Sequence, residues 1–89
     1  MSEESDTLFE FPCEFPIKVM GADEDALAVV LRRALKTHAP DSADNEFVLR
    51  ASSQGRYVSL TVTITATSKP QLDAIYQALT DADEVLVAL

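Results

Sequence analysis

Hydrophobic and polar residues alternate along residues 57–65, and this alternation is the most regular pattern in the chain. One set of alternate positions is apolar and consists of Val58, Leu60, Val62 and Ile64. The other set carries an aromatic ring or hydroxyl groups and consists of Tyr57, Ser59, Thr61, Thr63 and Thr65. A period of two predicts a strand with one buried face and one solvated face. The preceding segment Ser53-Gln54-Gly55 predicts a hairpin turn, in which Gly55 adopts a positive φ.

Three other stretches have strand character. Residues 15–20 alternate in the same way and end at Gly21, residues 47–52 (FVLRAS) precede the turn, and residues 85–89 (VLVAL) form a short apolar run. The stretch LFEFPCEFP, residues 8–16, contains two prolines, which exclude a helix and a central strand. We expect it to lead into the first strand in an extended form, with its phenylalanines packed over the edge of the core. An aromatic docking motif is the alternative.

Two segments have helical periodicity. The first begins at Asp23, a good N-cap, and ends before Pro40. Its apolar stripe consists of Leu27, Val30, Leu31 and Ala34. Basic residues follow toward its C-terminal turns, where the helix dipole favours cations; they are Arg32, Arg33, Lys36 and His38. The second helix begins at Ser68, in a capping-box pattern, and its stripe consists of Leu72, Ile75, Tyr76 and Leu79. Residues 41–46 are expected to form a polar loop.

The order of these elements is β-α-β-β-α-β, which predicts an α+β domain of the ferredoxin-like class. Four antiparallel strands form its sheet, and both helices cover one face of that sheet. The polar side of residues 57–65 then points toward water or a partner. We expect one domain over residues 8–89 and a disordered acidic tail over residues 1–7.

The charge of the chain argues against a nucleic-acid partner. Fifteen acidic and seven basic residues give a formal net charge of −8 over 89 residues, which repels phosphate at long range. RNA-recognition sheets stack two or three bases on aromatic side chains, and the outer side of residues 57–65 offers only Tyr57. An RNA-binding sheet is therefore the weakest alternative function.

We also expect no membrane partner and a cytoplasmic location. The apolar stretches are far shorter than the roughly 18 residues of a spanning helix. The N-terminal segment MSEESDTLFE lacks the basic and apolar regions of a signal peptide. Cys13 is the single cysteine, which excludes an internal disulfide.

Few residues could carry catalysis. Cys13 and His38 are the one cysteine and the one histidine, and a dyad would need them within hydrogen-bond reach. One histidine and one cysteine do not complete a structural zinc site, and the acidic groups do not match a calcium loop. We expect a protein that is not an enzyme and has no metal or cofactor. A small enzyme that uses Cys13 or His38 is the alternative.

The order of elements is similar to that of ACT regulatory domains, whose sheets pair side by side and which bind amino acids near the loop after the first strand. In this chain, Gly21 would permit a close backbone approach there, and a helix N-terminus would favour a carboxylate. Three acidic residues at 23–25 would compete with such a ligand. The candidate contacts for a small ligand or a protein partner are Gly21, Lys18, Arg50 and Tyr57. We also expect a homodimer through the sheet edges.

Four stretches together resemble the YbeD-like family of small bacterial proteins. They are FEFPCEFPIKVMG (residues 9–21), HAP (38–40), SSQGRYVSLTVTITAT (52–67) and ADEVLVAL (82–89). The resemblance implies a ferredoxin-like fold similar to the ACT-type regulatory domain of phosphoglycerate dehydrogenase. It also implies a regulatory role linked to lipoate metabolism, and it carries no catalytic residues over to this chain. We therefore expect a non-catalytic regulatory or protein-interaction domain.

Overall fold

The computed structural model describes residues 10–52 and 54–89. Its elements are β1 (Cys13–Gly21), α2 (Glu24–His38), the 3₁₀ helix η1 (Pro40–Ser42), β2 (Val48–Ala51), β3 (Val58–Ala66), α3 (Lys69–Thr80) and β4 (Val87–Ala88). The four strands form one antiparallel sheet in the order β2-β3-β1-β4. This is the predicted ferredoxin-like α+β arrangement. The expected tail, residues 1–7, lies outside the described residues.

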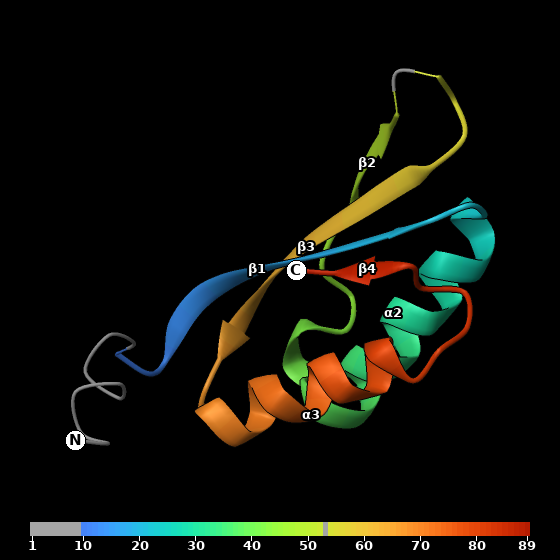
Figure 1. The fold of residues 1–89 in the computed structure, drawn as a ribbon. Coiled ribbons are helices and arrows are strands. Elements are labelled where there is room, and N and C mark those ends of the chain that lie inside the picture. The colour runs from blue at the N-terminus through green and yellow to red at the C-terminus, as the bar shows by residue number, and fades with distance from the viewer. Residues whose placement is uncertain (1–9, 53) are drawn as a thin grey trace.

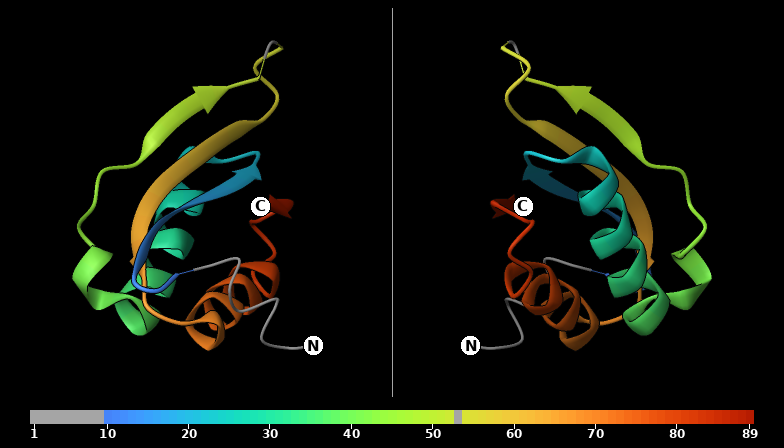
Figure 2. Two further views of the ribbon diagram at one scale, coloured as in Figure 1. Left: turned by 90° about the vertical axis from the view of Figure 1, so that its left-hand side faces the viewer. Right: turned by 90° about the vertical axis from the view of Figure 1, so that its right-hand side faces the viewer.

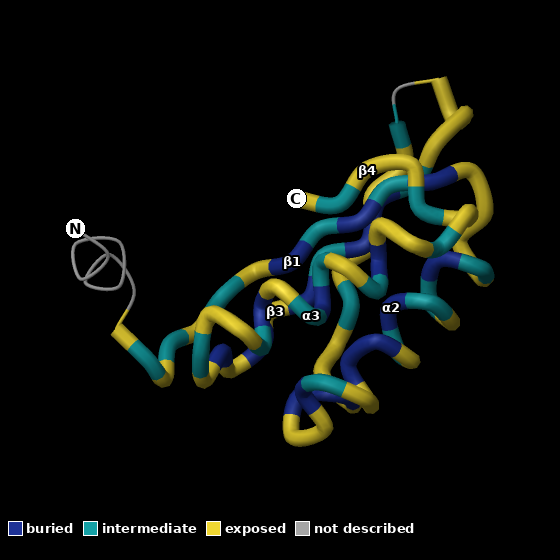
Figure 3. The backbone as a smooth tube through the Cα atoms, turned by 60° about the horizontal axis from the view of Figure 1, so that its bottom comes forward, coloured by how far each residue is buried: buried dark blue, intermediate teal, exposed yellow. Residues whose placement is uncertain are grey.

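Both helices lie on one side of the sheet, which curves over them (Figures 1 and 2). The sides of α2 and α3 that face the sheet are buried, whereas their outer sides are exposed (Figure 3). The largest fully buried side chains come from both layers and are Ile17, Val19, Leu27, Leu31, Leu35, Val62, Ile64, Ile75 and Leu79. The core is thus the single space between the sheet and the two helices.

The centre of the sheet is the long ladder between β1 and β3. Its register runs from Cys13 opposite Ala66 to Gly21 opposite Val58. In β3, Leu60, Val62 and Ile64 are buried against the helices, while Thr63 and Thr65 on the other side are exposed. The alternation in the sequence therefore identified both faces of this strand correctly.

The expectation that residues 8–16 stay out of a central strand is wrong from Cys13 onward. β1 lies between β3 and β4 and contains Pro16. The backbone groups of Lys18 and Met20 bond to β4 and its flanking residues, and those of Pro16 point to the same side because directions alternate along a strand. β4 pairs with Val19 and Met20, Leu89 bonds to Lys18, and none of the described residues pairs with β1 on this side of Pro16. The missing N–H of Pro16 therefore falls on an open edge, where proline is tolerated.

The phenylalanines of this lead-in do pack as the sequence predicted. Phe11 and Phe15 are partly buried and contact the core. Leu8 and Phe9, which belong to the same prediction, lie outside the described residues.

Helix α2 begins as its sequence predicts. The side chain of Asp23 accepts a hydrogen bond from the backbone N–H of Ala26 at 3.0 Å, and the helix ends at His38, two residues before Pro40. Leu35 is fully buried as well, so the apolar stripe contains one residue more than predicted.

Arg32, one of the cations that the sequence places toward the C-terminal turns of α2, interacts with the segment that follows the helix. Its guanidinium lies over the ring of Phe47, 3.9 Å from the ring centroid. It also donates hydrogen bonds to the backbone carbonyls of Ala43 and, at 3.1 Å, Asn45. Arg32 thereby attaches the segment between η1 and β2 to the helix.

The predicted polar loop at 41–46 is more ordered than its composition indicated. Its first residues complete the 3₁₀ helix η1, and Ser42 is buried, accepting a hydrogen bond from the backbone N–H of Thr65 at 3.1 Å. Asn45 donates to the carbonyl of Thr63 at 2.8 Å. The loop therefore continues the hydrogen bonding along β3 beyond the short strand β2.

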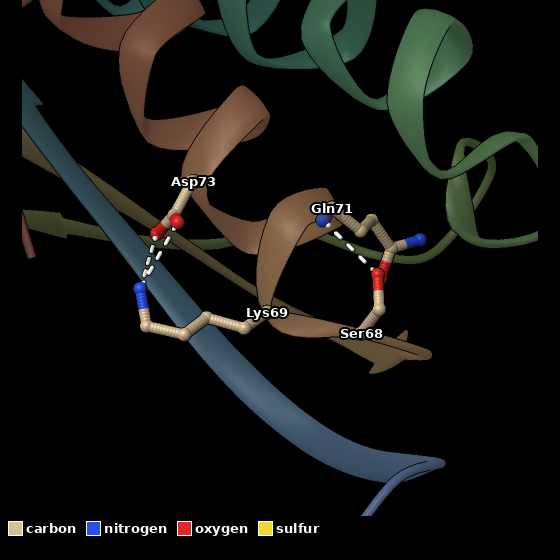
Figure 4. A network of polar contacts seen from close by, with 4 residues as sticks. All are labelled: Ser68, Lys69, Gln71 and Asp73. Carbon is tan, nitrogen blue, oxygen red and sulfur yellow. Dashed lines mark hydrogen bonds and ion pairs between the residues drawn. The ribbon is translucent and has the colours of Figure 1, made fainter. Parts of the chain in front are cut away.

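Helix α3 has a modified capping box (Figure 4). The side chain of Ser68 accepts from the N–H of Gln71 at 3.2 Å, as predicted. The side chain of Gln71 reaches back to the N–H of Thr67, not to that of Ser68, and also donates to the carbonyl of His38. This second bond ties the start of α3 to the end of α2.

The hairpin of β2 and β3 extends past the helices (Figure 1). Its turn is closed by a hydrogen bond from the N–H of Ser52 to the carbonyl of Tyr57 at 2.8 Å, and Gly55 has the predicted positive φ, 71°. All residues of β2 are exposed, because neither helix reaches beneath them. The last strand, β4, is shorter than the predicted residues 85–89.

Candidate functional site: the open sheet face

The side of the sheet away from the helices, here called the open sheet face, carries two adjacent rows of side chains. The strand register places Val48, Thr61, Lys18 and Leu89 in one row and Arg50, Ser59, Met20 and Val87 in the next. Tyr57 follows at the hairpin end. Three of the four residues predicted to make contacts, Lys18, Arg50 and Tyr57, thus share one face.

The middle of these rows is made of small hydroxyl residues flanked by longer side chains. Ser59 is only 7% exposed although it lies on the open face, because Met20 and Arg50 stand on either side of it. The two rows contain two cationic side chains, Lys18 and Arg50, and no acidic side chain. These two rows therefore present cationic side chains on a chain of net charge −8.

An apolar notch of about 130 Å³ lies at the β4 end of the open sheet face. It is lined by Met20, Tyr57, Leu86 and Val87. Leu86 is 58% exposed, so its apolar surface is available at the rim. The notch can accept one aliphatic or small aromatic group.

The outer edge of β2 has backbone groups that no strand among the described residues pairs with. The N–H of Ser52 points to β3, and because directions alternate along a strand, the groups of Arg50 also point there while those of Leu49 and Ala51 point away. The side chain of Leu49 is 46% exposed beside them. Such an edge is suited to pairing with another strand.

Gly21, the fourth predicted contact, lies on the opposite side and has a different role. A Cβ atom at this position would lie 2.5 Å from the carbonyl oxygen of Glu84 and 2.9 Å from Cδ2 of Leu27. The close backbone approach that the sequence indicated is therefore an approach of the chain's own α3–β4 connection. Gly21 does not join Lys18, Arg50 and Tyr57.

Cys13 and His38, on which the alternative hypothesis of a small enzyme depends, lie at one end of the domain. Cys13 begins β1 and packs against the core, and His38 ends α2, but no hydrogen bond joins their side chains. Within residues 10–52 and 54–89, no three His, Cys, Asp or Glu side chains converge into a metal-binding group. In the same residues, no helix has the length and apolar character to cross a membrane.

The phenol of Tyr76 has a pKa shifted from its ordinary value. Burial raises the pKa of the Tyr76 phenol above its ordinary value, because desolvation disfavours the phenolate. Tyr76 packs against the core from α3 and lies in neither the open sheet face nor the notch, so the shift belongs to packing.

Sequence reasoning did not single out the apolar part of this site. Met20 was placed on the outer side of its strand, and Leu86 and Val87 were assigned to a strand, but none was named as a contact. The available signal was the run VLVAL, which has no alternation and too few core positions to bury every side chain.

Comparisons with known proteins agree on the family of the chain. Residues 6–89 match the family described as "Protein of unknown function (DUF493)". A UPF0250 protein of Chromobacterium violaceum is 49% identical over 89 residues, and a UPF0250 protein of Nitrosomonas europaea is 47% identical over 89 residues; both alignments cover all of each chain. The solution structure of protein HP0495 from H. pylori has a TM-score of 0.69 at 20% identity, covering 91% of this chain and 85% of that one. It shares the fold.

Proposed function

This chain belongs to the DUF493 family of proteins of unknown function, as its YbeD-like resemblance indicated, and we propose that it is a non-catalytic protein-interaction domain with a regulatory role. Its binding surface is the open sheet face. One observation carries the proposal: five of the seven large apolar side chains that are exposed among the described residues lie on this face or at its edge and notch. They are Val48, Tyr57, Leu86, Val87 and Leu89.

The size of the notch favours a protein over a small ligand. Small-molecule sites commonly enclose about 300–1,000 Å³, whereas the notch measures about 130 Å³. A protein segment can place one apolar side chain there and cover the adjacent rows with its backbone. Lys18 and Arg50 then favour a segment that also carries carboxylates, since complementary charge at the rim steers association.

Self-association through β2 is part of the same proposal. Two β2 edges can pair antiparallel and join their sheets, using the outward N–H and C=O groups of Leu49 and Ala51. A Leu49→Lys variant places a charge on this edge, which opposes pairing. Light scattering across the micromolar range should show a dimer for the parent chain and a monomer for the variant. A parent chain that is monomeric throughout would remove this part of the proposal.

The link to lipoate metabolism, which rests on the family resemblance, directs the search for the partner. Enzymes that make or attach lipoate are the first proteins to test. The tagged chain would be purified from its native host at native abundance, and proteins that bind it would be identified by mass spectrometry.

A charge-reversed variant tests whether the open sheet face binds the partner. Lys18→Glu combined with Arg50→Glu should remove the partner while circular dichroism shows an intact fold. Lys69→Glu, which changes a cation on the exposed surface of α3, is the matched control and should retain the partner. Retention by the double variant, or equal loss in the control, would contradict the proposal.

The alternative of an enzyme has its own test. Cys13→Ala and His38→Ala should leave the host phenotype unchanged, because no geometry joins the two side chains into a dyad. A loss of function in both variants with an intact fold would favour the enzyme.

A further inference from the structure

A second surface lies on the helical side of the domain, along α2. It is a groove of about 570 Å³ between α2 and the end of α3. Its lining positions on α2 recur three and four residues apart from Ala26 to His38, so the groove follows this helix for about 18 Å. The wall includes alanines from both sides, Ala26, Ala34, Ala78 and Ala82, whose small side chains leave the groove open.

The two rims of this groove carry opposite charges that do not meet. Arg33 lies on the α2 rim, and Asp81, Asp83 and Glu84 lie on the opposite rim. Asp81 accepts a hydrogen bond from Gln77. Within residues 10–52 and 54–89, Arg33, Asp83 and Glu84 form no ion pair. Opposite charges thus flank the groove, and no ion pair joins Arg33 to the acidic rim in the described part of the chain.

Val29 adds apolar surface at the centre of the α2 rim. It is 54% exposed and is the one large apolar side chain exposed on either helix of the described chain. Val29 and Arg33 also border a shallower hollow that is lined by Ala28, Arg32 and Lys36. The α2 rim therefore presents a valine and adjoining cations one helical turn apart.

We infer that this groove binds an amphipathic helix of a partner protein, with carboxylates along one flank and amines or guanidiniums along the other. The apolar side of that helix covers Val29 and the alanines, its acidic flank faces Arg33, and its basic flank faces Asp83 and Glu84. A helix of three to four turns matches the length of the groove. The groove and the open sheet face lie on different layers, so this inference does not depend on the proposed function.

The charges discriminate against other occupants. An anionic membrane or a nucleic acid is negative across its whole contact surface and would meet Asp81, Asp83 and Glu84 beside Arg33. A uniformly basic helix would meet Arg33, and a uniformly acidic helix would meet the opposite rim. Only a segment with separated charges satisfies both rims.

Three designed peptides test the inference on the full chain. Each is a lactam-bridged helix of about four turns with the same leucine stripe; one has a glutamate flank and a lysine flank, one has two glutamate flanks, and one has two lysine flanks. Binding would be followed by amide chemical shifts. The charge-separated peptide should shift residues of α2 and the α3–β4 connection, and it should bind about tenfold more tightly than either other peptide, or about 1.4 kcal/mol.

Charge-reversed variants complete the test. Arg33→Glu should weaken the charge-separated peptide about tenfold, and adding both Asp83→Lys and Glu84→Lys should restore its affinity, because the two rims then exchange their charges and the peptide can bind in the reverse direction. Lys69→Glu, outside the groove, should have no effect. Equal affinity for all three peptides, shifts confined to the sheet, or no rescue would overturn the inference. Sedimentation showing that Arg33→Glu disrupts self-association would also overturn it, since the occupant would then be a second copy.

Discussion

Replacing Gly21 by alanine should destabilise the domain through one identified collision. The added Cβ would meet the carbonyl oxygen of Glu84 at 2.5 Å and Cδ2 of Leu27 at 2.9 Å. The first of these atoms belongs to the backbone, so it cannot move away by a change of rotamer. The α3–β4 connection must shift instead.

The magnitude follows from two opposing effects. Overpacking a core position costs about 1–3 kcal/mol, while glycine-to-alanine substitution stabilises by about 0.4–1 kcal/mol through the unfolded state. The net loss should be about 1–2 kcal/mol. Because m is about 1–3 kcal/mol per molar urea for small proteins, the urea midpoint should fall by roughly 1 M.

The position of the weakened hydrogen bonds distinguishes a local collision at Glu84 from strain spread over the whole domain. A shift of Glu84 should weaken the hydrogen bonds of Leu86 and Leu89 to β1, which amide hydrogen exchange would report. Gly55→Ala is the matched control, because Gly55 has a positive φ of 71° but open space around it. It should cost about 1 kcal/mol without altering exchange in β4. An unchanged urea midpoint for Gly21→Ala, or faster exchange of β4 amides in both variants, would refute the reasoning.

Three further substitutions test interactions that hold the fold. Arg32→Ala should lower the free energy of unfolding by about 1–3 kcal/mol, because the guanidinium stacks on Phe47 and bonds two carbonyls; Arg32→Lys, which keeps the charge, should recover less than half. Ser42→Ala should cost about 1–3 kcal/mol in urea titrations, since it leaves the N–H of Thr65 without its acceptor. Tyr76→Phe should flatten the alkaline loss of stability. The raised pKa of the phenol contributes stability that is complete below about pH 10 and is lost as the pH rises toward the folded pKa; urea midpoints at about pH 9 and 11 measure this difference.

Local chemistry made much of the fold predictable. The alternation of β3 identified its buried face, and the caps at Asp23 and Ser68 marked the starts of both helices. Each of these signals depends on neighbouring residues in the chain, which a sequence displays directly.

The features that escaped prediction depend on distant parts of the chain. Pro16 was excluded from a central strand because the extent of β4 beside it is not visible in the sequence. Arg32 was placed among helix-end cations because its partners, Asn45 and Phe47, meet it only after the loop returns along β3.

The candidate site likewise has features that neighbouring residues predict and features that depend on distant parts of the chain. The alternation of residues 15–20 placed Lys18 on the outer side, but only the register of three strands puts it one row from Arg50. Gly21 was predicted as a contact because the loop after the first strand permits a close backbone approach, but the pleat of β1 points Gly21 and Lys18 to different layers.

The long ladder between β1 and β3 has a consequence for how the chain folds. Cys13 pairs with Ala66 and Gly21 with Val58, so the pairing of the two central strands closes a loop that contains α2, η1 and β2. The β2–β3 hairpin joins neighbouring residues and can form within microseconds. Closing the large loop to β1 has an entropic cost before its contacts compensate, so we expect the complete domain to fold in milliseconds or longer. We therefore expect the hairpin that extends past the helices to form early in folding, and β1 to pair with it late.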